Sequence, residues 1–212
     1  VDIYPVVESF YASMESTLQL RWEAYGTNSY YIDAWHIDDI SVEVSNDCSA
    51  DEVNLWGTCF SISNTDSLNL SDSELTGPIP YELTELINLE YLNLSGNNLE
   101  DSIPFLQNLT LLKYLNLSEN NLNGPIPYGI GSLTNLEYLN LSKNAITWGG
   151  APIGGISGSV PDEIGNLENL VYLNFSQNNL SGSIPSSIGN LQNLDSVDLS
   201  MNFQMDWLTP VS

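Results

Sequence analysis

An eleven-residue phrase at residues 89–99, Leu-Glu-Tyr-Leu-Asn-Leu-Ser-Gly-Asn-Asn-Leu, constrains the fold most, because close variants of it recur along most of the chain. The intervals between the central apolar residues of these variants are 24, 23, 24, 34 and 24 residues by subtraction. Such a period is typical of a solenoid, in which each repeat buries its apolar edge only against its neighbours. The six central residues are Leu68, Leu92, Leu115, Leu139, Leu173 and Val197.

Each copy of the phrase predicts one short strand of a parallel sheet on the concave side of the solenoid. Strand side chains alternate between faces, so the leucines should point inward and the residues between them outward. An asparagine follows every strand except the first, where Ser73 stands instead. Its amide can serve both N–H and C=O groups of a tightly wound backbone. We therefore predict a structural ladder of Asn97, Asn120, Asn144, Asn178 and Asn202.

The other half of the repeat contains the spelling Leu-x-Gly-x-Ile-Pro, at residues 75–80, 122–127 and 180–185. Proline and glycine forbid a long helix, so the convex side should consist of extended segments and short 3₁₀ turns. This spelling resembles the plant-specific subclass of leucine-rich repeats, found in plant receptor kinase ectodomains, polygalacturonase-inhibiting proteins and secreted bacterial proteins. The resemblance covers residues 68–202 and implies an α/β-class leucine-rich repeat solenoid. We expect a secreted bacterial or environmental member of that subclass.

Three regions are predicted: a partial β-sandwich at residues 1–45, a cap at 46–65, and about six repeats at 66–212 with an insertion at about 147–156. The cap holds the two cysteines, Cys48 and Cys59. A disulfide between them would stabilise the fold by roughly 3 kcal/mol and would imply an oxidising compartment. The alternative is two free buried thiols. The apolar residues suited to cover the first repeat are Val53, Leu55, Trp56 and Phe60.

Residues 1–45 do not follow the repeat, and the segments 18–25 and 40–44 alternate in polarity as half-buried strands do. Residues 35–44 resemble the closing strand of extracellular jelly-roll domains of the MAM and cleaved-adhesin kind. That resemblance implies calcium as a cofactor, with Asp33, Asp38 and Asp39 as candidate ligands. The alternative is that these aspartates form turn and edge hydrogen bonds, because a calcium site needs six to eight oxygens. Two or three strands cannot complete a sandwich, so we expect this chain to be part of a longer protein.

Candidate binding residues lie on the outward columns of the predicted concave sheet. A row of tyrosines beside a row of amides suits a protein or polysaccharide partner, because rings offer apolar surface while phenols and amides hydrogen-bond. Cross-strand stacking alone would favour the same row, so both interpretations stay open. The residues are Tyr91, Tyr114, Tyr138 and Tyr172, with Asn93, Asn116, Asn140 and Asn174.

The interval of 34 residues marks an insertion after Ile146 that contains Trp148 and two following glycines. Insertions in one repeat map to loops on one face, and such loops often bind partners. Trp148 is therefore a candidate binding anchor. The alternative is a tolerated insertion whose tryptophan folds back on the solenoid.

Charge and chemistry exclude several classes of function. The chain has 3 Lys and Arg against 27 Asp and Glu, a formal net charge of −24. This charge would repel nucleic acids and anionic lipids. No apolar run approaches the roughly 20 residues that span a bilayer, so membrane insertion is not expected. The single histidine, His36, has no recognisable nucleophile beside it, so we expect no enzyme.

The leading hypothesis is a secreted or surface-attached binding and adhesion module that recognises a protein or polysaccharide. A second hypothesis is a spacer or self-assembling surface filament. The last repeat would expose an apolar edge for end-to-end association unless Trp207 and Leu208 cover it. A third is an accessory region of a larger secreted hydrolase.

Overall fold

The computed structural model describes residues 48–148 and 151–206. The chain divides between Glu43 and Val44 into two units, and the first unit lies outside the described residues. The predicted partial jelly-roll at residues 1–45, with its three candidate calcium ligands, therefore lies outside the described part too. All described residues belong to the second unit.

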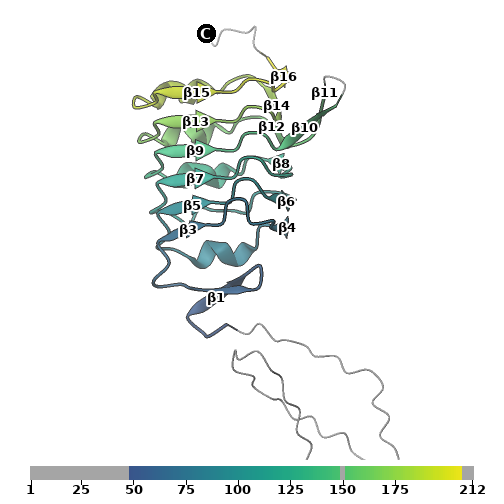
Figure 1. Ribbon diagram of the computed structural model, residues 1–212. Coiled ribbons are helices and arrows are strands. Elements are labelled where there is room, and N and C mark those ends of the chain that lie inside the picture. The colour runs from purple at the N-terminus through teal and green to yellow at the C-terminus, as the bar shows by residue number, and fades with distance from the viewer. Residues whose placement is uncertain (1–47, 149–150, 207–212) are drawn as a thin grey trace, which may run out of the picture. The chain divides into compact units, whose positions relative to one another are not determined.

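The second unit is a solenoid whose repeats each add one strand to a six-stranded parallel sheet (Figure 1). The strands are in register, so each central leucine lies opposite that of the next repeat, as Leu92 lies opposite Leu115. The predicted sheet is confirmed. In spatial order the strands are β15 (Ser196–Asp198), β13 (Tyr172–Asn174), β9 (Tyr138–Asn140), β7 (Tyr114–Asn116), β5 (Tyr91–Asn93) and β3 (Ser67–Asn69).

The Leu-x-Gly-x-Ile-Pro segments are extended, and they pair across repeats with the corresponding segments of neighbouring repeats. Glycine occupies left-handed backbone in these strands, as at Gly124 (φ 71°) and Gly182 (φ 74°), where other residues would be strained. An isolated bridge between Ser102 and Asn123 falls where the two groups of strands meet. The sequence predicts the extended segments but not their pairing. The strands are β4 (Thr76–Pro78) with β6 (Asn98–Glu100), then β8 (Gly124–Pro125), β12 (Ile156–Gly158), β14 (Asn179–Gly182) and β16 (Gln204–Met205).

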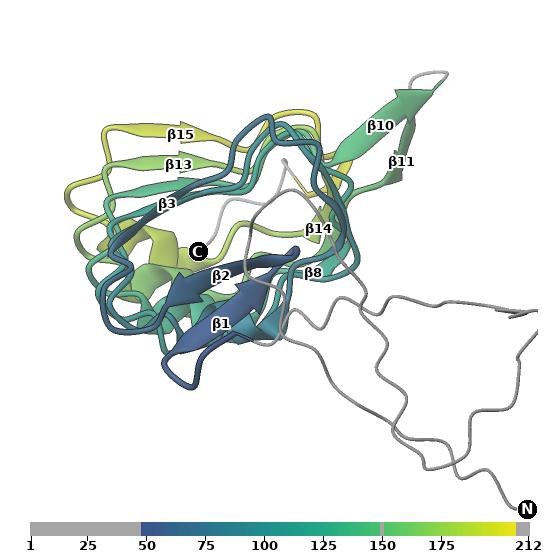
Figure 2. The same ribbon diagram turned by 60° about the horizontal axis from the view of Figure 1, so that its bottom comes forward.

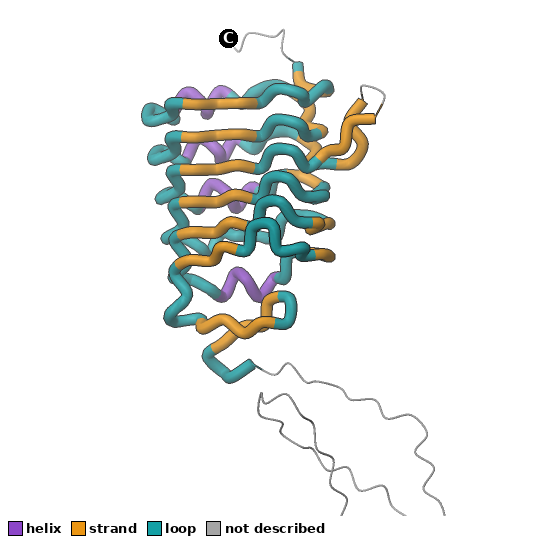
Figure 3. Tube along the Cα trace, in the orientation of Figure 1, coloured by secondary structure: helices purple, strands orange, loops and turns teal. Residues whose placement is uncertain are grey.

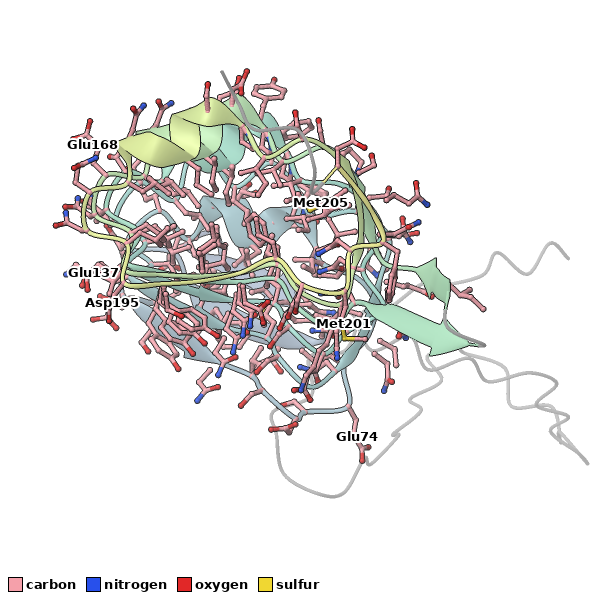
Figure 4. All side chains as sticks on the ribbon, turned by 90° about the horizontal axis from the view of Figure 1, so that it is seen from above. Glu74, Glu137, Glu168, Asp195, Met201 and Met205 are labelled. Carbon is pink, nitrogen blue, oxygen red and sulfur yellow. A yellow bond between two sulfur atoms is a disulfide. The ribbon has the colours of Figure 1, made fainter. Side chains whose placement is uncertain are left out.

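Short 3₁₀ helices form the side of the solenoid opposite the six-stranded sheet (Figures 3 and 4). Each begins directly after a proline, whose ring holds φ near the helical value while the chain enters from an extended ψ. None of the helices within residues 48–148 and 151–206 is long and apolar enough to cross a membrane. The helices are η1 (Tyr81–Glu85), η2 (Tyr128–Ser132), η3 (Asp162–Asn166) and η4 (Ser186–Asn190).

The core is a stack of leucine columns, and a column of buried asparagines runs beside it. Leu92, Leu115 and Leu139 are fully buried. The amide of Asn120 donates to the carbonyl oxygens of Leu94 and Leu117 at 2.9 and 3.3 Å, and its oxygen accepts the N–H of Leu99 at 3.0 Å. One side chain thus joins two successive repeats. Corresponding hydrogen bonds are made by Asn97, Asn144, Asn178 and Asn202.

An antiparallel hairpin caps the first repeat (Figure 2). It consists of β1 (Glu52–Leu55) and β2 (Thr58–Ser61), joined by a two-residue turn with positive φ at both Trp56 and Gly57. Val53 and Leu55 are buried, and Trp56 and Phe60 pack against the core. The predicted disulfide between Cys48 and Cys59 is confirmed, with an S–S distance of 2.06 Å.

The predicted insertion is a second antiparallel hairpin, formed by β10 (Ala145–Trp148) and β11 (Ala151–Gly154). It projects away from the solenoid beside the second set of strands (Figures 1 and 2). The chain returns to the solenoid through the buried Gly155, where a Cβ atom would lie 2.5 Å from that of Ala145. The sequence predicts the insertion at about 147–156, and the described hairpin occupies 145–154.

Candidate functional site: the tyrosine face

The outward side of the six-stranded sheet, called here the tyrosine face, carries four tyrosine rings in one stack. Ring centroids of neighbouring strands are 4.4, 4.3 and 4.5 Å apart, with interplanar angles of 12, 8 and 5°. In-register parallel pairing places each ring directly beside the next, close to the strand spacing of about 4.8 Å. The rings, in order along the stack, are Tyr91, Tyr114, Tyr138 and Tyr172.

The stack determines which parts of the rings a partner can reach. Both faces of the Tyr114 and Tyr138 rings are covered by neighbouring rings, because the planes are nearly parallel. These two residues present only ring edges and phenolic oxygens. Among the described residues, the outer faces of Tyr91 and Tyr172 lack an aromatic neighbour, because serines occupy the paired positions on β3 and β15. The two ends of the stack therefore differ chemically from its middle.

The asparagine row beside the tyrosines is largely engaged within the protein. The side-chain oxygen of Asn93 accepts hydrogen bonds from the backbone N–H and hydroxyl of Ser95 at 3.1 and 2.7 Å. The amide of Asn174 donates to the phenolic oxygen of Tyr172 at 3.1 Å. These side-chain oxygens and amides are thus already hydrogen-bonded within the protein, so they are less available to a partner. Asn116 and Asn174 bond to the serine two residues further on as Asn93 does, and Asn140 accepts from the N–H of Ser142.

Burial within the stack changes the acidity of the middle tyrosines. Burial raises the pKa of Tyr114 to about 12, and the neighbouring Tyr138 and Tyr91 add to this rise. Burial also raises the pKa of Tyr138 above its usual value, against the opposing effect of the hydrogen bond from Asn140. Both phenols are therefore neutral hydrogen-bonding groups at physiological pH.

The residues that precede the tyrosines form a mostly acidic border where the strands begin. Lys113 contacts Glu90 at 2.6 Å. Lys143, the other lysine of the described ranges, does not belong to this border, and it contacts Glu119 at 2.6 Å. Both basic side chains within residues 48–148 and 151–206 are thus paired with carboxylates of the preceding repeat. Glu137 and Asp195 lie at the same border of the sheet (Figure 4). The border comprises Asp66, Glu90, Lys113, Glu137, Val171 and Asp195.

The second predicted site, Trp148, lies on the projecting hairpin and not on the tyrosine face. It is the last residue of β10 and pairs with Ala151 of β11. The exposed Ile153 lies on the same hairpin. The structure therefore places the two candidate sites on separate elements, and Trp148 stays a predicted anchor.

No metal centre is formed by the part of the chain that the structure describes, since no three His, Cys, Asp or Glu side chains there are grouped to hold an ion. The predicted ligands Asp33, Asp38 and Asp39 lie outside that part. Calcium binding stays a prediction.

The two serines just beyond the ends of the tyrosine stack were not singled out from the sequence. Ser67 and Ser196 replace tyrosine at the first and last positions of its row. This replacement is visible when the repeats are aligned, but its meaning depends on the rings being stacked face to face. A group of exposed aromatic residues outside the tyrosine face was also missed, comprising Tyr81, Phe105 and Tyr128.

Comparison with known proteins identifies the class of scaffold. Models of the leucine-rich repeat match residues 87–129, 132–151 and 169–191. The leucine-rich repeat ectodomain of the receptor kinase SOBIR1 from Arabidopsis thaliana has a TM-score of 0.58 at 32% identity, covering 66% of this chain and 71% of its own. The chain belongs to the leucine-rich repeat family. A comparison with curated protein sequences finds no match.

Two further structures from Arabidopsis thaliana are similar and contain bound partners. The ectodomain of the receptor kinase GASSHO1/SCHENGEN3, in complex with CASPARIAN STRIP INTEGRITY FACTOR 2, has a TM-score of 0.57 at 38% identity. That match covers 63% of this chain but only 15% of the receptor chain. The BIR3–SERK2 complex has a TM-score of 0.55 at 32% identity, covering 77% of this chain and 80% of that chain.

Proposed function

We propose that this protein is an extracellular, non-catalytic binding module that recognises a protein or peptide on its tyrosine face. The observation that carries the proposal is the unbroken stack of four rings across adjacent strands. Aromatic side chains give large contact area at low cost in conformational entropy, and they are enriched at protein interfaces. The solenoid holds them in place, because each ring stands on a strand paired on both sides.

The ring geometry favours a protein partner over a polysaccharide. Sugars stack on ring faces, and both faces of Tyr114 and Tyr138 are covered by neighbouring rings. What these two middle rings still present is a row of phenolic hydroxyls and ring edges, which can hydrogen-bond to peptide groups and contact apolar side chains. The similar ectodomains in complex with peptide or protein partners support the same choice.

The extracellular location is supported by the disulfide between Cys48 and Cys59, since such bonds persist in oxidising compartments. The similarity to plant receptor ectodomains supports it too. The same relatives, together with the Leu-x-Gly-x-Ile-Pro strands, support the plant-specific subclass of repeats. A bacterial source, adhesion, the jelly-roll segment and calcium remain predictions from the sequence.

A display selection tests the proposal and does not require the natural partner to be identified first. The full chain is immobilised and used to select from a random peptide library, and it is also applied to an array of polysaccharides. Selected peptides should lose binding to the Tyr114→Ala/Tyr138→Ala variant and keep binding to Tyr81→Ala/Tyr128→Ala. Tyr81 and Tyr128 are matched controls, because they begin the 3₁₀ helices η1 and η2 and are 72% and 64% exposed.

The outcomes of the selection separate the candidate functions. Peptides that bind both variants equally well would place the site elsewhere and contradict the proposal. Polysaccharide binding that depends on Tyr114 and Tyr138, without any peptide binding, would replace the protein partner by a carbohydrate. Circular dichroism of each variant checks that the solenoid is intact.

End-to-end self-association is a second candidate, favoured by the last strand of the sheet. Val197 of β15 is 51% exposed, whereas the residues at the same position of the other five strands are 0 to 4% exposed. Among the described residues β15 is an edge strand of the six-stranded sheet, and an edge strand is a template for pairing with another chain. Sedimentation velocity over a range of concentrations tests this candidate: association that is lost in Val197→Lys supports it, and a concentration-independent monomer contradicts it.

A further inference from the structure

We propose that the two open ends of the tyrosine stack bind cationic side chains, lysine or arginine, of the protein partner. This inference rests on the proposed function, because it uses the same face, and it names the chemistry of the partner. It assigns a role to Tyr91 and Tyr172 that the middle rings cannot perform.

Among the residues that the structure describes, one ring face is left uncovered at each end of the stack. Tyr172 pairs with Ser196 and Tyr91 pairs with Ser67, both of them exposed serines too small to cover a ring. Each end of the stack therefore presents one ring face beside a small side chain. A cation is attracted to such a face by the ring quadrupole, and arginine fits it best because its guanidinium is planar.

Negative charge lies beside both open rings. An exposed aspartate directly precedes each of these serines, Asp195 before Ser196 and Asp66 before Ser67. Each open ring thus has an exposed carboxylate one residue before the serine that it pairs with on the neighbouring strand. Within residues 48–148 and 151–206 both lysines are already paired with glutamates, so no basic residue there is left to neutralise these aspartates. This acidic face is therefore complementary in charge to a basic partner.

The two ends of the stack should differ in how tightly they bind a cationic side chain. At the first end, Glu90 beside Tyr91 is held by the ammonium group of Lys113, which opposes an incoming cation. At the last end, the residue beside Tyr172 is the uncharged Val171, which is 43% exposed and adds apolar contact. The Tyr172 end should therefore bind more tightly. A cation over an exposed ring beside a carboxylate corresponds to about a tenfold preference over a neutral side chain of the same shape.

The test uses two short Gly/Ser peptides that are identical except for one central residue, arginine in one and the uncharged isostere citrulline in the other. Each is titrated into the full chain at physiological ionic strength, and the ring signals of the tyrosines are followed by NMR. The arginine peptide should shift Tyr172 first and Tyr91 at higher concentration, with about tenfold tighter binding than the citrulline peptide. Equal binding of the two peptides would overturn the proposal.

Three variants separate this site from general attraction to an acidic protein. Ser196→Tyr extends the stack and covers the open face of Tyr172 without changing any charge, so arginine should no longer shift the Tyr172 signals, should shift those of the introduced ring instead, and should leave binding at Tyr91 unchanged. Asp195→Asn should weaken binding at Tyr172. Asp162→Asn removes the same charge from η3, on the opposite side of the solenoid, and should have no effect.

Retained arginine binding at Tyr172 in Ser196→Tyr, or an equal loss in Asp195→Asn and Asp162→Asn, would overturn the proposal. Failure of this cation-binding proposal can be told apart from failure of the proposed protein-binding function. If display selection yields peptides that depend on Tyr114 and Tyr138 but carry no excess of lysine or arginine, the tyrosine face binds a protein while the cation sites do not exist.

Discussion

Two columns of asparagine flank the same buried leucines, and their side chains make different hydrogen bonds. In the interior column, the amide of Asn120 bonds to two successive repeats, and Asn178 and Asn202 are 0% and 1% exposed. In the outer column, the Asn93 side-chain oxygen bonds to Ser95 of its own repeat. The interior column joins repeats, whereas the outer column shapes the tyrosine face. Regular repetition of a residue therefore does not by itself show whether it serves the fold or a partner.

Removal of an interior asparagine should have the largest effect on stability. Asn120→Ala leaves the buried N–H of Leu99 without its side-chain acceptor and takes one of two asparagine donors from each of the carbonyls of Leu94 and Leu117, so it should lower the free energy of unfolding by about 4 kcal/mol. Urea denaturation followed by circular dichroism measures this loss. The control is Asn123→Ala, an exposed residue, which should change stability by less than about 0.5 kcal/mol. Equal stability of the two variants would show that the interior column does not hold the repeats together.

Two glycines of the 3₁₀ helices, Gly165 and Gly189, provide a second pair of variants, which tests how closely successive repeats pack on that side. A Cβ atom on Gly165 would lie 2.5 Å from the backbone oxygen of Ser187, in the next repeat, whereas one on Gly189 would have no atom within 4 Å. Gly165→Ala should therefore cost about 3 kcal/mol through overpacking. Gly189→Ala should be close to neutral. Chemical denaturation of both variants checks the contrast, and a similar loss in both would contradict the packing described for η3 and η4.

Loss of one ring from the stack should have a smaller effect on stability. Tyr138→Ala removes two stacked contacts of a half-buried ring and should destabilise the protein by about 2 kcal/mol. Binding of a selected peptide should nevertheless be lost. A denaturation curve and a binding titration on the same sample compare the two effects. If Tyr138→Ala destabilised the solenoid as much as Asn120→Ala is expected to, the tyrosines would belong to the fold as much as the interior asparagines do.

The dependence of stability on pH through the tyrosine stack should be the smallest of these effects. The folded pKa of Tyr114, about 12, lies above the ordinary value of 10.0. Its contribution to stability is therefore fully present below pH 10 and is lost as the pH rises through about 12. The near-ultraviolet phenolate absorbance of the wild type, minus that of Tyr114→Phe, should titrate near pH 12. A midpoint near the ordinary value would show that the rings are not packed as described.

The sheet could be predicted from the sequence because each repeat spells the same alternation, and in-register pairing of identical phrases stacks like on like. The hydrogen bonds of Asn97 and Asn120 follow from the same repetition. The pairing of the Leu-x-Gly-x-Ile-Pro segments could not be predicted, because it joins residues of different repeats and its register depends on how the solenoid coils. The hairpin at residues 145–154 was predicted only as an insertion, because its length was evident but its pairing was not.

The tyrosine row was predicted as a candidate site with two open interpretations, stacking or binding. The stacking distances of 4.3 to 4.5 Å describe the first and leave the second as a proposal. The open ends could not be found before the planes of the rings were known. Ser67 and Ser196 interrupt the row in the sequence, but only the ring planes show that a face is left uncovered beside each of them.

Hydroxyl-radical footprinting of the full chain with and without a saturating selected peptide tests the central claim most directly. We expect the peptide to protect Tyr91, Tyr114, Tyr138 and Tyr172 from oxidation. Tyr81 and Tyr128, on the 3₁₀ side, should be oxidised equally in both samples. Protection of Tyr81 and Tyr128 with unchanged oxidation of the four stacked rings would contradict the assignment of the tyrosine face as the binding site.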